Sequence, residues 1–171
     1  CGMRRMPREG IIFLSKQIGN FKMGTLHEVE ELDGSPWFRA ARENTPTTRP
    51  EGVAIMSDVT GFGLAGTILS VAHRHGLHCQ VSLNDSHAVH DAVRRIPFQC
   101  MMENLEGETG LCFRNAAAYQ LATCRELCGP FVMFAEYGTT EKDLASSGMP
   151  EALELGHFES GVPVSVVFDY D

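Results

Sequence analysis

The alternation of hydrophobic and polar positions along the chain predicts short strands separated by helices. Strand-length apolar or alternating stretches lie at residues 11–15, 53–56, 79–83, 131–135, 153–158 and 164–168. Apolar residues at helical spacing predict helices at residues 35–43, 64–75, 87–95, 115–127 and 141–146. The pattern in residues 18–31 and 99–110 favours neither a strand nor a helix. Strands alternating with helices indicate an α+β (α/β layered) fold, with a sheet covered by helices in one domain.

The clearest junction between a strand and a helix follows residues 53–56. Asp58 stands at the predicted strand tip, Gly61 and Gly63 form a turn, and Gly76 is the expected stop of the helix that follows. A helix N-terminus offers unpaired backbone N–H groups and a positive dipole end, which suit phosphate. An aspartate beside it can hold the magnesium that accompanies phosphate. The simpler interpretation is a tight turn that uses glycine for positive φ.

A resemblance to a known family rests on three segments. Residues 58–66 (DVTGFGLAG) resemble the DVTGFGLxGH signature of selenophosphate synthetase, also called selenide, water dikinase. Residues 11–19 (IIFLSKQIG) resemble the strand and TKPLG segment that open the C-terminal domain of that family, and residues 152–158 (ALELGHF) resemble its penultimate strand. The family belongs to the superfamily related to aminoimidazole ribonucleotide synthetase.

This resemblance implies a fold, a site and a partner. Residues 1–171 would be a single C-terminal-type domain with its core at about 10–168, built as a mixed sheet covered by helices. The family converts ATP and hydrogen selenide to selenophosphate, AMP and phosphate. Asp58 would be a ligand of Mg²⁺, and Thr60, Gly61, Phe62 and Gly63 would lie near the phosphates of ATP.

The family's ATP-binding N-terminal domain has no counterpart in this chain. That domain dimerises and holds most of the ATP, so the resemblance implies an N-terminal partner domain in the same or another chain and a homodimeric parent. This chain alone would then be inactive.

Three features depart from the family pattern. The family has a P-x-T-S-G-G loop where this chain has residues 125–130 (RELCGP), and it usually has histidine where this chain has Thr67. The family's asparagine-rich helix ahead of the signature is shortened here and replaced by a Pro/Thr loop at residues 45–50. Two alternatives therefore stay open. One is a non-catalytic scaffold in which Asp58 caps the helix or bonds to nearby backbone N–H groups. The other is a sister branch of the superfamily, such as thiamine-monophosphate kinase, hydrogenase-maturation or purine-synthesis enzymes.

Composition narrows the class of protein. The 171 residues are 43% hydrophobic and 21% charged, which is ordinary for a globular domain. The net charge of −8 argues against a nucleic-acid partner, and the lack of a long apolar run argues against a membrane span. No secretory signal is visible.

Cysteines and histidines suggest no metal or disulfide site. The six cysteines lack the spacing of a disulfide framework, so we expect free thiols in a reduced, cytoplasmic compartment. Cys124 and Cys128 are expected on one face of a helix. His73, His75 and His78 are close in sequence, but His73 and His75 would point to different sides of a helix end, which disfavours a shared metal ion.

Overall fold

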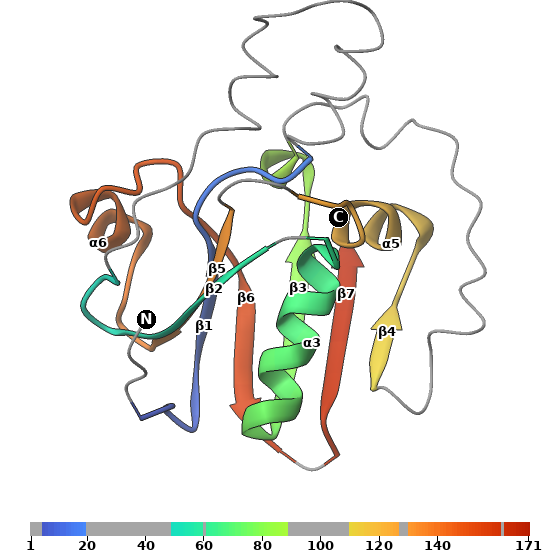
Figure 1. The fold of residues 1–171 in the computed structure, drawn as a ribbon, viewed down its shortest axis with the longest axis horizontal. Coiled ribbons are helices and arrows are strands. Elements are labelled where there is room, and N and C mark those ends of the chain that lie inside the picture. The colour runs from blue at the N-terminus through green and yellow to red at the C-terminus, as the bar shows by residue number, and fades with distance from the viewer. Residues whose placement is uncertain (1–4, 20–48, 60, 89–109, 127–129, 162) are drawn as a thin grey trace, which may run out of the picture.

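A computed structural model describes residues 5–19, 49–59, 61–88, 110–126, 130–161 and 163–171 (Figure 1). Its elements are β1 (Glu9–Leu14), β2 (Val53–Asp58), α3 (Gly63–His75), β3 (Leu77–Leu83), the 3₁₀ turn η1 (Asp85–His87), β4 (Leu111–Phe113), α5 (Ala116–Ala122), β5 (Phe131–Glu136), α6 (Glu141–Ser146), β6 (Leu153–Ser160) and β7 (Ser165–Tyr170). Every strand that the hydrophobic pattern predicts is present. The helices predicted at 64–75 and 141–146 are also confirmed.

Three expectations need correction. The helix predicted at 115–127 ends at Ala122, where the hydroxyl of Thr123 and the thiol of Cys124 bond to carbonyls of the last turn. Cys124 therefore lies beyond the helix, and Cys128 lies outside the described residues. His87, the expected first residue of a helix, belongs to η1 and is followed by Ala88 in extended conformation. Residues 89–95, the helix predicted at 35–43 and most of the segment 18–31 lie outside the described residues.

The short strand β4 was missed by the sequence prediction. It has only three residues, which is too short for alternation to stand out from a loop. It forms the edge of the sheet by pairing in parallel with β7.

The strands form one mixed sheet in the order β2-β5-β1-β6-β3-β7-β4. Pairing is antiparallel from β2 to β3, and parallel where β7 joins β3 and β4. Two cores lie on its two faces. Figure 1 shows α3 lying across β3 and β7, and the larger core includes residues of α3 and α5. The smaller core joins Leu144 of α6 to β1, β2 and β5.

Strand β1 contributes side chains to both cores in alternation. In β1, Ile12 and Leu14 belong to the larger core, whereas Ile11 and Phe13 pack in the smaller one. Both faces of β1 are therefore apolar, which explains its continuous hydrophobic run. The expectation of an α+β layered fold with a mixed sheet covered by helices is confirmed.

One edge of the sheet gathers most of the polar loop ends. Strands β1, β2, β3 and β7 end there, and β5 and β6 begin there, as the pairs Asp58–Phe131, Leu14–Leu153 and Leu83–Tyr170 show. We call this side of the sheet, which is formed by strand ends and not by an outer strand, the Asp58 edge. In the described part of the chain, no helix has the length and apolarity needed to cross a membrane.

The three cysteines of the described residues are free thiols, as expected. Cys79 and Cys124 are buried, and Cys112 is half-buried. Burial raises the pKa of Cys79 to about 12, so its thiol stays protonated and packs as a small apolar group.

Candidate functional site at the Asp58 edge

Asp58 is the last residue of β2, and its side chain is exposed. Among the described residues, no side chain or backbone group forms a hydrogen bond or ion pair with its carboxylate. The backbone around it is fixed, because its neighbour Val59 donates to the carbonyl of Pro130 at 2.8 Å. The carboxylate of Asp58 is therefore held at the end of a paired strand and is open to a ligand from solvent.

Helix α3 begins directly after the glycine turn, and no side chain caps it. Phe62 occupies the N-cap position without a side-chain hydrogen bond, and the first turn contains no acidic residue. The N–H groups of this turn and the positive end of the helix dipole therefore have no anionic partner in the helix itself. Gly61 and Phe62 are both exposed, Phe62 to 85%. Thr60 lies outside the described residues.

The glycines of this turn differ in whether the structure requires glycine at their positions. Gly63 has φ +69°, and an added Cβ would lie 2.8 Å from the carbonyl oxygen of Ala122. At Gly66 an added Cβ would lie 2.5 Å from the Cβ of Phe62. The simpler interpretation, turn geometry and packing, thus accounts for these two. It does not account for Gly61, where an added Cβ would meet nothing within 4 Å and φ is not left-handed.

Thr67, where the family usually has histidine, ties α3 to the end of β2. Its hydroxyl lies 3.0 Å from the carbonyl oxygen of Gly63 and 3.3 Å from that of Asp58. Because a hydroxyl has one proton, it donates to one carbonyl at a time. Thr67 can therefore connect the helix to the backbone carbonyl of Asp58.

Residues distant in sequence lie beside Asp58. Phe131 pairs with Asp58 on one side, and on the other it exchanges hydrogen bonds with Ser15. Neighbouring strands are about 4.8 Å apart, so Ser15 and the buried Lys16 lie roughly 10 Å from Asp58. Residues 11–19 carry part of the family resemblance, but their place beside Asp58 could not be predicted, because the pairing of β5 between β1 and β2 has no local signal in the sequence.

His87 fastens the loop after β3 to this edge. Its Nδ1 accepts the N–H of Asn84 at 3.0 Å, so the neutral ring carries its proton on Nε2 and donates it to the carbonyl of Glu154 at 2.9 Å. Burial is the main reason that its pKa lies below the ordinary value, and the charge of Glu141 acts in the opposite direction. The carbonyl of His87 accepts the N–H of Ile18, which joins this loop to the segment after β1.

No three histidine, cysteine, aspartate or glutamate side chains of the described residues converge as a metal site. The described residues therefore bring no such group around Asp58. A single carboxylate still fits Mg²⁺, which commonly takes one or two carboxylates and completes its shell with water and substrate phosphate oxygens.

Comparison with solved structures identifies the fold. The chain is similar to hydrogenase maturation protein HypE in complex with ATP, with TM-score 0.56 and 15% identity over 96% of this chain and 46% of that one. It is also similar to HypE in a HypE–HypF complex (TM-score 0.55, 19% identity, 91% and 48% coverage). A third structure is thiamine-monophosphate kinase from Stenotrophomonas maltophilia K279a (TM-score 0.55, 13% identity, 98% and 52% coverage).

These likenesses establish the fold. They come from two of the sister branches that the sequence resemblance groups with selenophosphate synthetase. The chain spans about half the length of these solved structures. A scan against protein-family models and a search of curated proteins found no match.

Proposed function

We propose that this chain is the C-terminal domain of an ATP-dependent phosphotransferase, and that the reaction of the parent enzyme is the phosphorylation of selenide. The observation that carries the proposal is the exposed, unpartnered carboxylate of Asp58 beside the uncapped N-terminus of α3. The signature of residues 58–66 supports selenide as the substrate. The HypE complex with ATP supports ATP as the nucleotide.

Each residue of the turn has a role in this proposal. Asp58 holds Mg²⁺, which neutralises charge on the polyphosphate as it is cleaved. The N–H groups at the start of α3 face phosphate oxygens, and Gly61 lets the phosphate approach the backbone closely. Phe62 borders the same space, Gly63 sets the direction of the helix, and Thr60 keeps the place near the phosphates that the resemblance implies.

The ATP-binding half completes the site. It supplies most contacts to ATP, the nucleophile and the homodimer contact of the parent. We therefore expect this chain alone to be inactive, and we place the parent enzyme in the cytoplasm.

The alternative of a non-catalytic scaffold explains Asp58 poorly. In that alternative Asp58 caps the helix or bonds to nearby N–H groups, yet its carboxylate has no such bond among the described residues. The sister-branch alternative is favoured by the likeness to thiamine-monophosphate kinase. The replacement of the P-x-T-S-G-G loop by residues 125–130 bears on both alternatives, because Pro130 contacts Val59 next to Asp58.

A substrate assay on the parent protein separates these functions. ATP is supplied with selenide in one reaction and with thiamine monophosphate in another, and AMP, ADP and phosphate are measured. The proposal expects selenide-dependent release of AMP. ADP formation with thiamine monophosphate alone would support the sister branch, and no turnover with either substrate would support the scaffold.

A further inference from the structure

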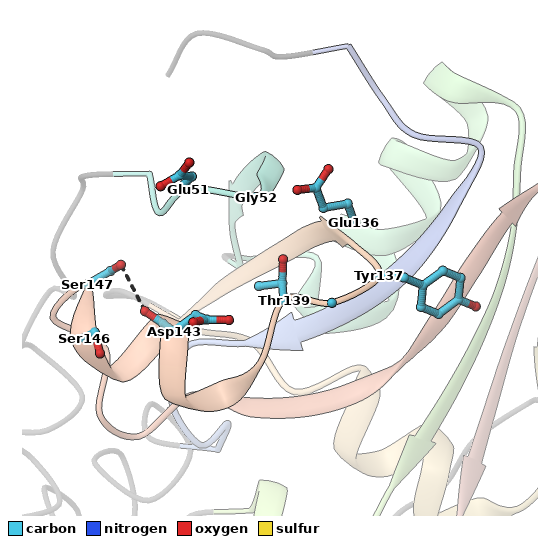
Figure 2. Close-up of a pocket in the computed structure, with 9 residues that line it drawn as sticks. Glu51, Gly52, Glu136, Tyr137, Thr139, Asp143, Ser146 and Ser147 are labelled. Atoms are coloured by element: carbon cyan, nitrogen blue, oxygen red, sulfur yellow. Dashed lines mark hydrogen bonds between the residues drawn. The ribbon is translucent and has the colours of Figure 1, made fainter.

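A pocket lies at the other end of β2, away from Asp58. It has a volume of about 430 Å³ and is formed by the turn before β2, the end of β5 and helix α6 (Figure 2). Asp58 comes six positions after Gly52, so at about 3.3 Å per position the two places are roughly 20 Å apart. We call it the acidic pocket.

The side chains of the acidic pocket carry negative charge without a compensating base. Glu51, Glu136 and Asp143 line it, and no lysine, arginine or histidine does so in the described part of the chain. Asp143 already accepts the N–H and hydroxyl of Thr140 with its Oδ2. The carboxylates of Glu51 and Glu136 form no hydrogen bond or ion pair among the described residues. The potential in the pocket therefore favours a cation.

Thr139 supplies an independent sign of a ligand. Its side chain is only 9% exposed, yet its hydroxyl forms no hydrogen bond with any described residue. The oxygen of this hydroxyl is still accessible to solvent. Among the described residues, the only fully enclosed side-chain polar atom without a partner is Nε2 of His75. Figure 2 shows the hydroxyl directed between Glu51 and Glu136, so the direction open to it is the pocket. A ligand group in the pocket can therefore bond to this hydroxyl in place of water.

The size of the pocket suits a cation larger than a bare metal ion. No three acidic side chains of the described residues converge as metal ligands. The ring of Tyr137 points away from the carboxylates in Figure 2, so it offers no face for a single quaternary ammonium group. The volume falls in the range of small-molecule sites, which begins at about 300 Å³.

From these features we propose that the acidic pocket binds a small organic diamine. One ammonium group donates hydrogen bonds to Thr139 Oγ1 and Glu136, and the second is held by Glu51. The hydroxyls of Ser146 and Ser147 donate to carbonyls of their own helix, which leaves their lone pairs facing the ligand. This site is independent of the function proposed for Asp58.

Titration of the full chain with 1,4-diaminobutane at constant ionic strength tests the proposal, by calorimetry and by amide NMR shifts. We expect saturable binding, with the largest shifts at Gly52 and Gly138. The double variant Glu51→Gln/Glu136→Gln should weaken binding at least about tenfold, as expected for loss of charge-assisted hydrogen bonds. Thr139→Val should weaken it several-fold and Thr139→Ser should not, which separates loss of the hydroxyl from a folding defect.

Two controls make the test specific. Glu154→Gln/Asp171→Asn removes the same charge from exposed side chains at the Asp58 edge and should leave the affinity unchanged. Mg²⁺ at the same concentration should not displace the diamine. Absence of saturable binding, equal weakening by the control variant, displacement by Mg²⁺, or full affinity in a folded Thr139→Val variant would each overturn the proposal.

Discussion

The two ends of strand β2 both carry exposed carboxylates beside glycines, but their surroundings differ. At the Asp58 edge, one carboxylate faces solvent next to a helix N-terminus, and loops distant in sequence are tied together by hydrogen bonds to Phe131, Thr67 and His87. At the acidic pocket, the walls come from the turn before β2 and the continuous segment 136–147. The first arrangement suits a metal-bound anion, and the second suits an organic cation. A charge pattern alone therefore does not define a site, because the backbone groups around it decide which ligand fits.

The largest loss of stability should come from replacing the glycine that positions the turn at the Asp58 edge. Gly63→Ala would force a side chain into left-handed φ and against the carbonyl of Ala122, so we expect a loss of ~3 kcal/mol in the free energy of unfolding. Gly76→Ala is the matched control, since Gly76 has φ +66° but open space around it, and should cost only about 1 kcal/mol. Urea denaturation measures both values. Equal losses would mean that segment 122–124 does not restrain the turn.

The next largest effect on stability comes from His87 and depends on pH. Its pKa in the folded chain is lowered, so the unfolded ring takes up a proton below about pH 6.5 while the folded ring stays neutral. Stability should therefore be full above that pH and fall as the pH decreases toward the lower folded pKa. Protonated Nδ1 would also face the N–H of Asn84.

Urea midpoints at about pH 7.5 and about pH 5 measure this effect. The difference between the two midpoints should shrink in His87→Gln and persist in His73→Gln, whose side chain is exposed. An unchanged difference in His87→Gln would show that another group causes the pH dependence.

A smaller effect should follow from Thr67→Val, which keeps the shape but removes the hydroxyl that bonds the carbonyls of Gly63 and Asp58. We expect a loss of about 1 kcal/mol in the free energy of unfolding. Ser70→Ala, an exposed change on the same helix, should cost much less. A Thr67→Val variant as stable as the native chain would contradict the role given to this connection.

The smallest effect on stability belongs to the acidic pocket. Glu51→Gln/Glu136→Gln should slightly raise the thermal midpoint at low salt, because it relieves repulsion between exposed carboxylates, and the gain should vanish at high salt. A gain that is independent of salt would indicate a cause other than charge.

Much of this architecture could be predicted from the sequence, and the elements that could not be predicted depend on contacts outside the local sequence. The apolar run Phe131–Ala135 and the Thr140 cap of α6 are local signals, and both elements are where the pattern predicts them. Helix α5 ends earlier than predicted, at Ala122, and carbonyls of its last turn accept side-chain bonds from Thr123 and Cys124 that helix propensity does not include.

The acidic pocket escaped prediction for another reason. Glu51 and Glu136 come together only because β2 pairs with β5, a long-range contact without a local signature. The position of Asp58 could be predicted because strand tip, turn and helix are consecutive in the chain. Its neighbours Ser15 and Phe131 could not.

The most direct test of the account measures the Mg²⁺ dependence of ATP affinity in the parent protein. The native protein, Asp58→Asn and the exposed control Asp171→Asn are compared with and without Mg²⁺. We predict that Mg²⁺ strengthens ATP binding in the native and control proteins, and that Asp58→Asn loses most of this gain while its affinity without Mg²⁺ is preserved. An equal Mg²⁺-dependent gain in Asp58→Asn and the native protein would contradict the role of Asp58 as the metal ligand.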